Sequence, residues 1–305
     1  MENVIEINHL SKDFGHGRGV FDISLKVKKG ECFGYLGPNG AGKSTTIRML
    51  MGFTRPDKGE ALIFSKNNLK SRYEVMQNVS YIPGEVSLPP LLKGKDVIKE
   101  QKKLKNVTDD TFLNWLIKEF DLDTSLRCKE MSIGMRRKLV IVCAFMSDPD
   151  LIIMDEPSSG LDPEMQAKFI ELIKLEKKRG KTILLSSHIF SEVDAVCDEI
   201  AIIKDGKIVS FFNANDLKHN TKKLYKVTFS RESYENIFKD NQEFYKIIDK
   251  NDSTNEVTFI VEDDKVSLFI GLLTYYNVLD MIELKETLED YFMKFYKEDK
   301  EFKGL

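Results

Sequence analysis

The sequence predicts an α/β fold with a mostly parallel sheet, an antiparallel β subdomain, a helical insertion and a small α+β domain at its end. Three observations support this prediction. Short apolar strands alternate with helices through residues 31–64 and 151–212, which is typical of a parallel sheet covered by helices. Residues 94–146 interrupt this alternation with helical periodicity. After residue 215 a new pattern begins.

The first part of the chain is expected to start with antiparallel strands. Alternating apolar residues predict two of them, over residues 4–10 and 20–27. Further segments follow in order: a strand at 31–37, a helix at 43–53, and strands at 59–64 and 79–82. After the helical insertion we expect strands at 151–155, 182–187, 199–206 and 207–212, with helices at 163–178 and 189–196.

Residues 216–305 are predicted to form a separate accessory domain. The expected segments are strands at 224–229, 243–249, 256–261 and 278–285, with helices at 231–239 and 266–276. The order β-α-β-β-α-β is that of a split-βαβ sandwich. A final amphipathic helix is predicted, and it would either pack on its own domain or bind a partner. Its apolar stripe consists of Leu288, Tyr291, Phe292, Phe295 and Tyr296.

Composition excludes several classes of protein. The chain has 305 residues, 42% hydrophobic and 31% charged, and its net charge of −3 gives no reason to expect a nucleic-acid partner. Apolar runs such as Leu139–Met146 are far shorter than the roughly 20 residues that span a bilayer. No signal peptide or zinc pattern is visible, and the cysteines have no paired spacing. We therefore expect an intracellular protein with reduced thiols and no membrane span.

A glycine-rich segment after the strand at 31–37 carries the most specific motif. Residues 37–45 match G-x-x-x-x-G-K-[ST] and open a helix, so the parallel core is predicted to be a P-loop NTPase core. Backbone N–H groups and the helix N-terminus would hold the phosphates of ATP. Lys43 would reach the β- and γ-phosphates, and Ser44 would bind Mg²⁺. The nucleotide contacts are predicted to be Gly37, Pro38, Asn39, Gly40, Ala41, Gly42, Lys43, Ser44 and Thr45.

Two acids end the apolar strand at 151–155. Asp155 is predicted to hold Mg²⁺ through water, and Glu156 to polarise the attacking water. The alternative is a strand end with two solvated acids. Such acids are costly at the end of a buried strand unless they face a cation or a cleft.

Two further features follow the helical insertion. Ser132 and Gly134 stand immediately before a helix, where they form either an ordinary N-cap or a second anion site. His188 follows the strand at 182–187, at the sheet edge where the phosphates would lie. A single histidine is more often structural.

In their order along the chain, these motifs resemble the ABC-type ATPase family over about residues 3–215. The resemblance implies that Ser132 and Gly134 contact the γ-phosphate held by a second subunit. It places Asp162 at the dimer seam and His188 on the γ-phosphate. Phe14 matches the aromatic residue that stacks on adenine. Lys43, Glu156 and His188 are thus the expected catalytic residues.

The sequence departs from the family pattern at two motifs. The usual L-S-G-G-Q signature reads Met-Ser-Ile-Gly-Met at residues 131–135, and the following "GMRRK" is similar to many bacterial exporter ATPases. The family's aromatic-x-Pro-Gln loop has Gly84 in place of Gln. We hypothesise that the next residue, Glu85, partly replaces the amide near Mg²⁺; the alternative is a surface acid on a connecting loop.

The resemblance implies the nucleotide-binding subunit of a bacterial ABC exporter of the multidrug or peptide type. Residues 1–215 would be the ATP-binding domain, with its helical insertion at about 86–146. The expected partners are a second copy or paired ATPase subunit and separate transmembrane permease subunits. The chain would then lie in the cytoplasm, on the inner face of the cell membrane. The alternative is a soluble ABC-type ATPase acting on ribosomes or DNA.

Overall fold

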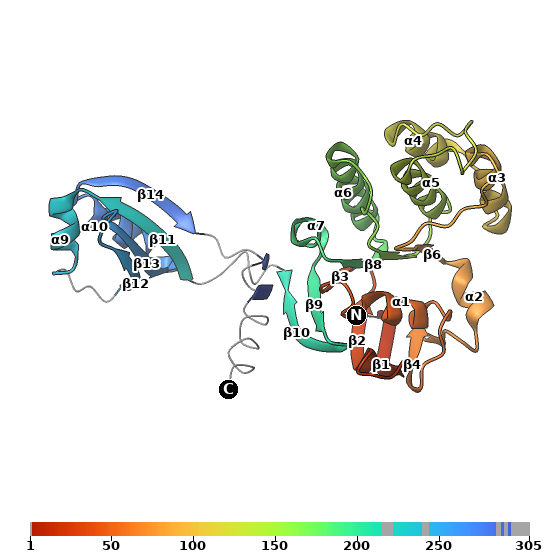
Figure 1. The fold of residues 1–305 in the computed structure, drawn as a ribbon, viewed down its shortest axis with the longest axis horizontal. Helices are drawn as coiled ribbons and strands as arrows, with labels where there is room; N and C mark the ends of the chain where they lie inside the picture. Colours follow the sequence, from red (N-terminus) through yellow and green to blue (C-terminus); the bar gives the residue numbers. More distant parts are fainter. Residues whose placement is uncertain (1, 215–221, 240–243, 285–287, 290–291, 294–305) are drawn as a thin grey trace. The chain divides into compact units, whose positions relative to one another are not determined.

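The structure is a computed structural model, and it describes residues 2–214, 222–239, 244–284, 288–289 and 292–293. The chain forms two compact units, Met1–Ala214 and Asn215–Leu305 (Figure 1). Each unit has its own apolar core. The α/β fold class expected from the sequence is confirmed, including its antiparallel sheet, helical insertion and α+β ending.

A six-stranded sheet forms the centre of the first unit. Its strand order is β10-β9-β3-β8-β7-β6, and every neighbouring pair is parallel except β10 with β9. Its strands are β3 (Cys32–Leu36), β6 (Val79–Ile82), β7 (Leu151–Asp155), β8 (Thr182–Ser187), β9 (Glu199–Lys204) and β10 (Lys207–Asn213). All residues of β3, β7 and β8 are buried, which explains the apolar runs at residues 151–154 and 183–185.

A second, antiparallel sheet has the order β2-β1-β4-β5. Its strands are β1 (Asn3–Asp13), β2 (Gly19–Lys28), β4 (Lys58–Ile63) and β5 (Lys66–Asn67), and α2 (Arg72–Gln77) follows them. Helix α1 (Lys43–Leu50) lies between the two sheets and contacts strands of both (Figure 1). It is shorter than the predicted helix over 43–53 because Gly52 adopts a positive φ of 70°.

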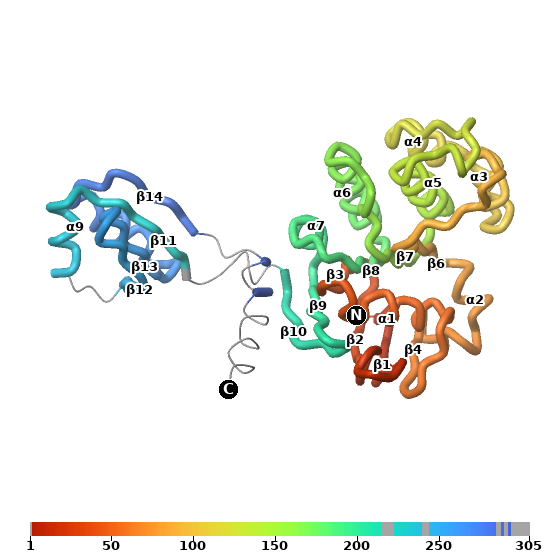
Figure 2. Tube along the Cα trace, viewed as in Figure 1, coloured from red at the N-terminus to blue at the C-terminus, as the bar shows by residue number. Residues whose placement is uncertain are grey.

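The helical insertion contains α3 (Gly94–Leu104), α4 (Thr111–Glu119) and α5 (Ile133–Phe145), which group together beside β6 (Figure 2). Helix α5 contacts both of the other helices and β6. After β7 come α6 (Pro163–Lys178) and α7 (Phe190–Val196). They lie on the face of the central sheet opposite α1 (Figure 1).

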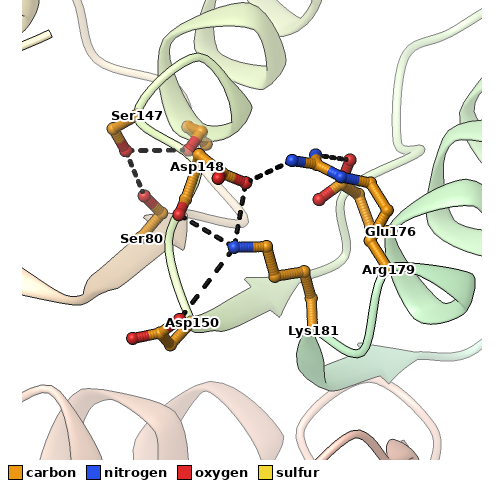
Figure 3. A network of polar contacts seen from close by, with 8 residues as sticks. Ser80, Ser147, Asp148, Asp150, Glu176, Arg179 and Lys181 are labelled. Atoms are coloured by element: carbon orange, nitrogen blue, oxygen red, sulfur yellow. Dashed lines mark hydrogen bonds and ion pairs between the residues drawn. The ribbon is translucent and has the colours of Figure 1, made fainter.

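A polar network connects the segments that precede β7 and β8 (Figure 3). Lys181 Nζ is 2.9 Å from Asp148 Oδ1, and Arg179 Nη2 is 2.8 Å from the same oxygen. Arg179 also donates to Glu176 at 2.7 Å. Burial raises the pKa of Glu176, and the Arg179 guanidinium opposes that rise. The network lies at the amino-terminal edge of the sheet, opposite the carboxyl-terminal edge where the nucleotide site is predicted.

The second unit is a four-stranded antiparallel sheet in the order β12-β13-β11-β14, with α9 and α10. Its elements are β11 (Lys222–Phe229), α9 (Arg231–Ile237), β12 (Tyr245–Asn251), β13 (Glu256–Glu262), α10 (Val266–Leu273) and β14 (Val278–Leu284). The predicted β-α-β-β-α-β order is confirmed. Of the predicted final helix, Leu288 and Phe292 are buried, and Tyr291, Phe295 and Tyr296 lie outside the described residues.

The helices of the described residues also bear on membrane insertion. None of the helices there combines the length and the apolar character that crossing a bilayer requires.

Candidate functional site

The glycine-rich loop joins β3 to α1 at the carboxyl-end edge of the central sheet. Gly40 and Gly42 have φ angles of 83° and 110°, in the left-handed region that favours glycine. A Cβ on Gly37 would lie 2.5 Å from the carbonyl oxygen of Ile203. The close approach and the two positive φ angles explain why the loop needs glycine at these positions.

The loop borders a cleft of about 440 Å³. The predicted nucleotide residues that line it are Phe14, Asn39, Gly40, Gly42, Lys43, Ser44 and Thr45, with Glu156 beside them. Five lining residues were not predicted from the sequence: Gly17, Arg18, Gly19, Asp205 and Gly206. The cleft thus combines the loop, the helix N-terminus and the strand-end acid.

Lys43 is the first residue of α1, and only 5% of its surface is exposed. Its ammonium donates hydrogen bonds to the carbonyl oxygens of Gly37 at 2.6 Å and Pro38 at 3.0 Å. It also lies 3.1 Å from Glu156 Oε1. This contact is an ion pair without hydrogen-bond geometry, so Oε1 is buried without a donor.

Glu156 stands between Lys43 and His188. Its other carboxylate oxygen, Oε2, lies 2.5 Å from His188 Nδ1. Its backbone N–H donates to the carbonyl of Ser186 at 3.0 Å, and its φ is 48°. A non-glycine residue in the left-handed region costs conformational energy and often marks a functional site. This strained residue is the one that follows β7 and lines the cleft.

Asp155 precedes Glu156, and only 2% of its surface is exposed. The Ser186 hydroxyl donates to Oδ1 at 2.6 Å. The second oxygen faces Gly84, where an added Cβ would be 3.2 Å from Oδ2. A carboxylate here and the Ser44 hydroxyl in the cleft are the oxygen donors that Mg²⁺ prefers. Both groups have the donor chemistry for Mg²⁺, but only Ser44 is among the residues that line the cleft, so a magnesium ion held by Ser44 and Asp155 stays a prediction.

The signature residues lie at the start of α5. The Ser132 side chain accepts a hydrogen bond from the backbone N–H of Met135 at 3.1 Å, as an N-cap does. A Cβ on Gly134 would lie 3.0 Å from the carbonyl of Gly160. Ser132 and Gly134 are absent from the residues that line the cleft of the same chain. Asp162 is absent too, and it caps α6 by accepting from Met165 N at 3.0 Å.

Comparison with known proteins identifies the family. A family model for ABC transporters matches residues 20–159. The ABC transporter ATP-binding protein YhcH of Bacillus subtilis (strain 168) is 30% identical over 99% of this chain and 98% of its own length. The chain belongs to the ABC transporter ATP-binding proteins. It is an ATPase, as the sequence predicts.

Two further comparisons support the assignment of this chain to the ABC ATPases. The bacitracin transport ATP-binding protein BcrA of Bacillus licheniformis is 28% identical over 96% of this chain and 97% of its own length. A solved ATP-binding subunit of an ABC transporter matches with a TM-score of 0.65 and 29% identity, over 70% of this chain and 92% of that chain.

Phe14 presents an aromatic surface to the cleft of the ABC ATPase. Its ring is 54% exposed, and Lys12 Nζ lies 5.9 Å from its centroid. Phe14 follows the last residue of β1, and its N–H donates to the carbonyl of Arg18 at 2.9 Å, which closes the turn that carries the ring. An exposed ring in this position is able to stack on a nucleobase.

Glu85 has an exposed side chain and follows Gly84, the residue that faces Asp155. Its assignment as a magnesium ligand therefore stays a prediction.

Sequence reasoning missed two buried polar residues near the site, Arg137 and Glu192. Both lie at buried positions of helices, Arg137 in α5 and Glu192 in α7. Arg137 is four residues before the buried Ile141, and that helical spacing signals a charge on the apolar face. A charge in such a position requires partners, which the sequence does not identify.

Proposed function

We propose that this chain is the ATP-hydrolysing subunit of a bacterial ABC exporter. The observation that carries the proposal is the position of Glu156, which lines the cleft with Lys43 beside a loop shaped for phosphates and also contacts His188. The full-length similarity to BcrA and the exporter-like "GMRRK" segment support transport, with export as its direction.

Hydrolysis would begin when the loop binds ATP. The backbone N–H groups of residues 37–45 would hold the phosphates, and the Lys43 ammonium would move from Glu156 to the γ-phosphate. Oε1 of Glu156 would then be free to accept a proton from the attacking water. His188 would hold the other carboxylate oxygen in place. A magnesium ion held by Ser44 and Asp155 would neutralise phosphate charge.

The active unit would be a dimer of ATPase subunits. Ser132 and Gly134 lie outside the cleft of their own chain, although the family resemblance places them on a γ-phosphate. A second copy, or a paired ATPase subunit, would bring its signature to the open side of the cleft. Asp162 would then lie at the seam between the two subunits.

A permease subunit would dock beside the loop after β6. A mainly apolar groove of about 390 Å³ lies there, bordered by α2, α3, α5 and β6. Its lining includes Tyr81, Pro83, Leu88, Val97 and Val140. Docking would place the ATPase on the inner face of the cell membrane and would link the groove to Asp155 through Gly84.

Co-purification tests this function against its alternative. Tagged full-length chain, recovered from detergent-solubilised membranes, is expected to bring a multi-span membrane protein with it. Leu88→Glu places a charge in the groove and is expected to lose that protein, whereas Leu104→Glu, at an exposed position outside the groove, keeps it. Recovery of ribosomes or DNA without an integral membrane protein would contradict the proposal.

A further inference from the structure

Arg137 is an arginine in the interior of the first unit. Only 3% of its surface is exposed, and its guanidinium reaches two different loops. Nη1 and Nη2 donate to the carbonyl oxygens of Pro83 at 2.6 Å and Gly84 at 2.5 Å. Nε donates to the carbonyl of Ser159 at 3.1 Å. One side chain of α5 therefore joins the loop after β6 to the loop after β7.

The negative charges of Asp155 and Glu156 stabilise the positive charge of Arg137 through electrostatic attraction alone. Burial lowers the pKa of the guanidinium, and the negative charges of Asp155 and Glu156 oppose this change. Within the part of the chain that the structure describes, its hydrogen bonds all go to backbone carbonyls. Burying a charged guanidinium costs free energy unless these carbonyl oxygens stay within hydrogen-bonding distance of it.

The first two residues of the loop after β6, Pro83 and Gly84, offer few polar groups for attachment. Pro83 lacks a backbone N–H, and Gly84 lacks a side chain. Apart from the backbone N–H of Gly84, the polar groups of these two residues are their carbonyl oxygens, and Arg137 binds both. Gly84 in turn faces Oδ2 of Asp155.

We infer that Arg137 is a positioning residue that sets Pro83, Gly84 and Ser159 relative to Asp155 and Glu156. Displacement of the signature helix α5 on dimer closure is then transmitted to both loops at once. This inference rests on the proposed function, since it assigns Arg137 to the same hydrolytic site. The planar fork of arginine serves two separate loops, whereas a lysine ammonium concentrates its donors on one atom.

The test compares Arg137→Lys and Arg137→Gln with Arg136→Lys, a matched change at the half-buried neighbour in the same helix. We expect both Arg137 variants to lower kcat for ATP about 10- to 100-fold, because small misplacements of reacting groups have effects of that size. The KM for ATP is expected to change by less than about threefold, since Arg137 is absent from the residues that line the cleft. Arg136→Lys is expected to match the wild type.

Hydrogen exchange separates positioning from a general loss of structure. In the Arg137 variants, amides of residues 85–88 and 158–162 are expected to exchange faster together, while those of β3 and α1 stay protected. A fall in kcat without this joint change, or protection lost throughout the first unit in both variants, overturns the inference. A wild-type chain without ATPase activity contradicts the proposed function instead, and the exchange pattern still decides the role of Arg137.

Discussion

Lys43 Nζ and Glu156 Oε1 lie 3.1 Å apart, and only 5% and 17% of the two side chains are exposed. The pair joins the expected phosphate-binding cation to the expected base. Removing one charge leaves the other without this partner, so that Lys43 keeps only its carbonyl acceptors and Glu156 only its contact with His188. The same two groups must also separate before Glu156 accepts a proton from water, so ATP binding and activation of the base are linked.

Replacing Lys43 by Met is expected to weaken ATP binding about 10- to 100-fold, the loss that corresponds to a charge-assisted hydrogen bond. Met keeps most of the buried volume while removing the ammonium. Fluorescent-nucleotide titration measures the effect. Lys168→Met, which breaks a helix-surface pair with Glu164, is the control and should bind ATP as the wild type does. Equal affinities for Lys43→Met and the wild type would contradict the assignment.

Two substitutions of Ser132 distinguish its role as the N-cap of α5 from its predicted contact with a phosphate. Ser132→Ala removes the cap of α5 and is expected to cost about 1 kcal/mol of stability. Ser132→Asn keeps a capping side chain, so its Tm should remain near the wild type. Both variants are expected to lose at least about tenfold in turnover: alanine has no hydroxyl to donate to a phosphate, and the larger amide of asparagine no longer fits against one.

A second cap controls for this effect. Ser230→Ala removes the N-cap of α9 in the other unit, and it should lower stability there without changing turnover. Turnover of Ser132→Asn equal to the wild type would show that Ser132 acts as a cap alone.

Changing Glu85 tests the departure from the family pattern. If this residue supplies an oxygen near Mg²⁺, Glu85→Ala is expected to raise the Mg²⁺ concentration for half-maximal turnover about tenfold, and Glu85→Gln less. Magnesium titrations of ATPase activity, with and without the permease, measure this. Glu100→Ala, at an exposed helical position, is the control. No effect of either Glu85 variant in either setting would show a surface acid.

Glu192 predicts a pH dependence of stability. Its side chain is buried, accepts from Ser187 Oγ at 2.6 Å, and has one oxygen without a donor. Burial raises its pKa. A carboxyl group with a raised folded-state pKa stabilises the fold fully below its unfolded pKa of about 4.3, and this contribution is lost as pH rises through the folded-state pKa.

Glu192→Gln removes that dependence. Its Tm is therefore expected to exceed the wild-type value by an increasing amount as pH rises from about 4.3 towards 8. Thermal unfolding across this range measures the difference. Glu171→Gln, on the exposed face of α6, should show no such trend. A Tm difference for Glu192→Gln that is constant with pH would contradict the prediction.

Much of the site was readable from local sequence. The segment 37–45 and the acids at 155 and 156 follow buried strands, and parallel strands bring their carboxyl ends to one edge. The β-α-β-β-α-β order was also readable, since hydrophobic periodicity distinguishes its helices from its strands.

Contacts between segments far apart in the chain could not be predicted from the local sequence. The bonds from Arg137 to Pro83, Gly84 and Ser159 join segments up to 54 residues apart. The left-handed backbone of Glu156 has no glycine to signal it. Short elements such as α2 and β5 also escaped prediction, because they carry too few apolar positions to show a period.

The most direct test of the central claim is phosphate release by full-length Glu156→Gln in saturating MgATP. We predict turnover at least about 100-fold below the wild type, with ATP affinity retained and an ATP-dependent dimer on size-exclusion chromatography. Glu164→Gln, an exposed change at the start of α6, should hydrolyse ATP normally. Turnover of Glu156→Gln near the wild-type rate would contradict the assignment of Glu156 as the base.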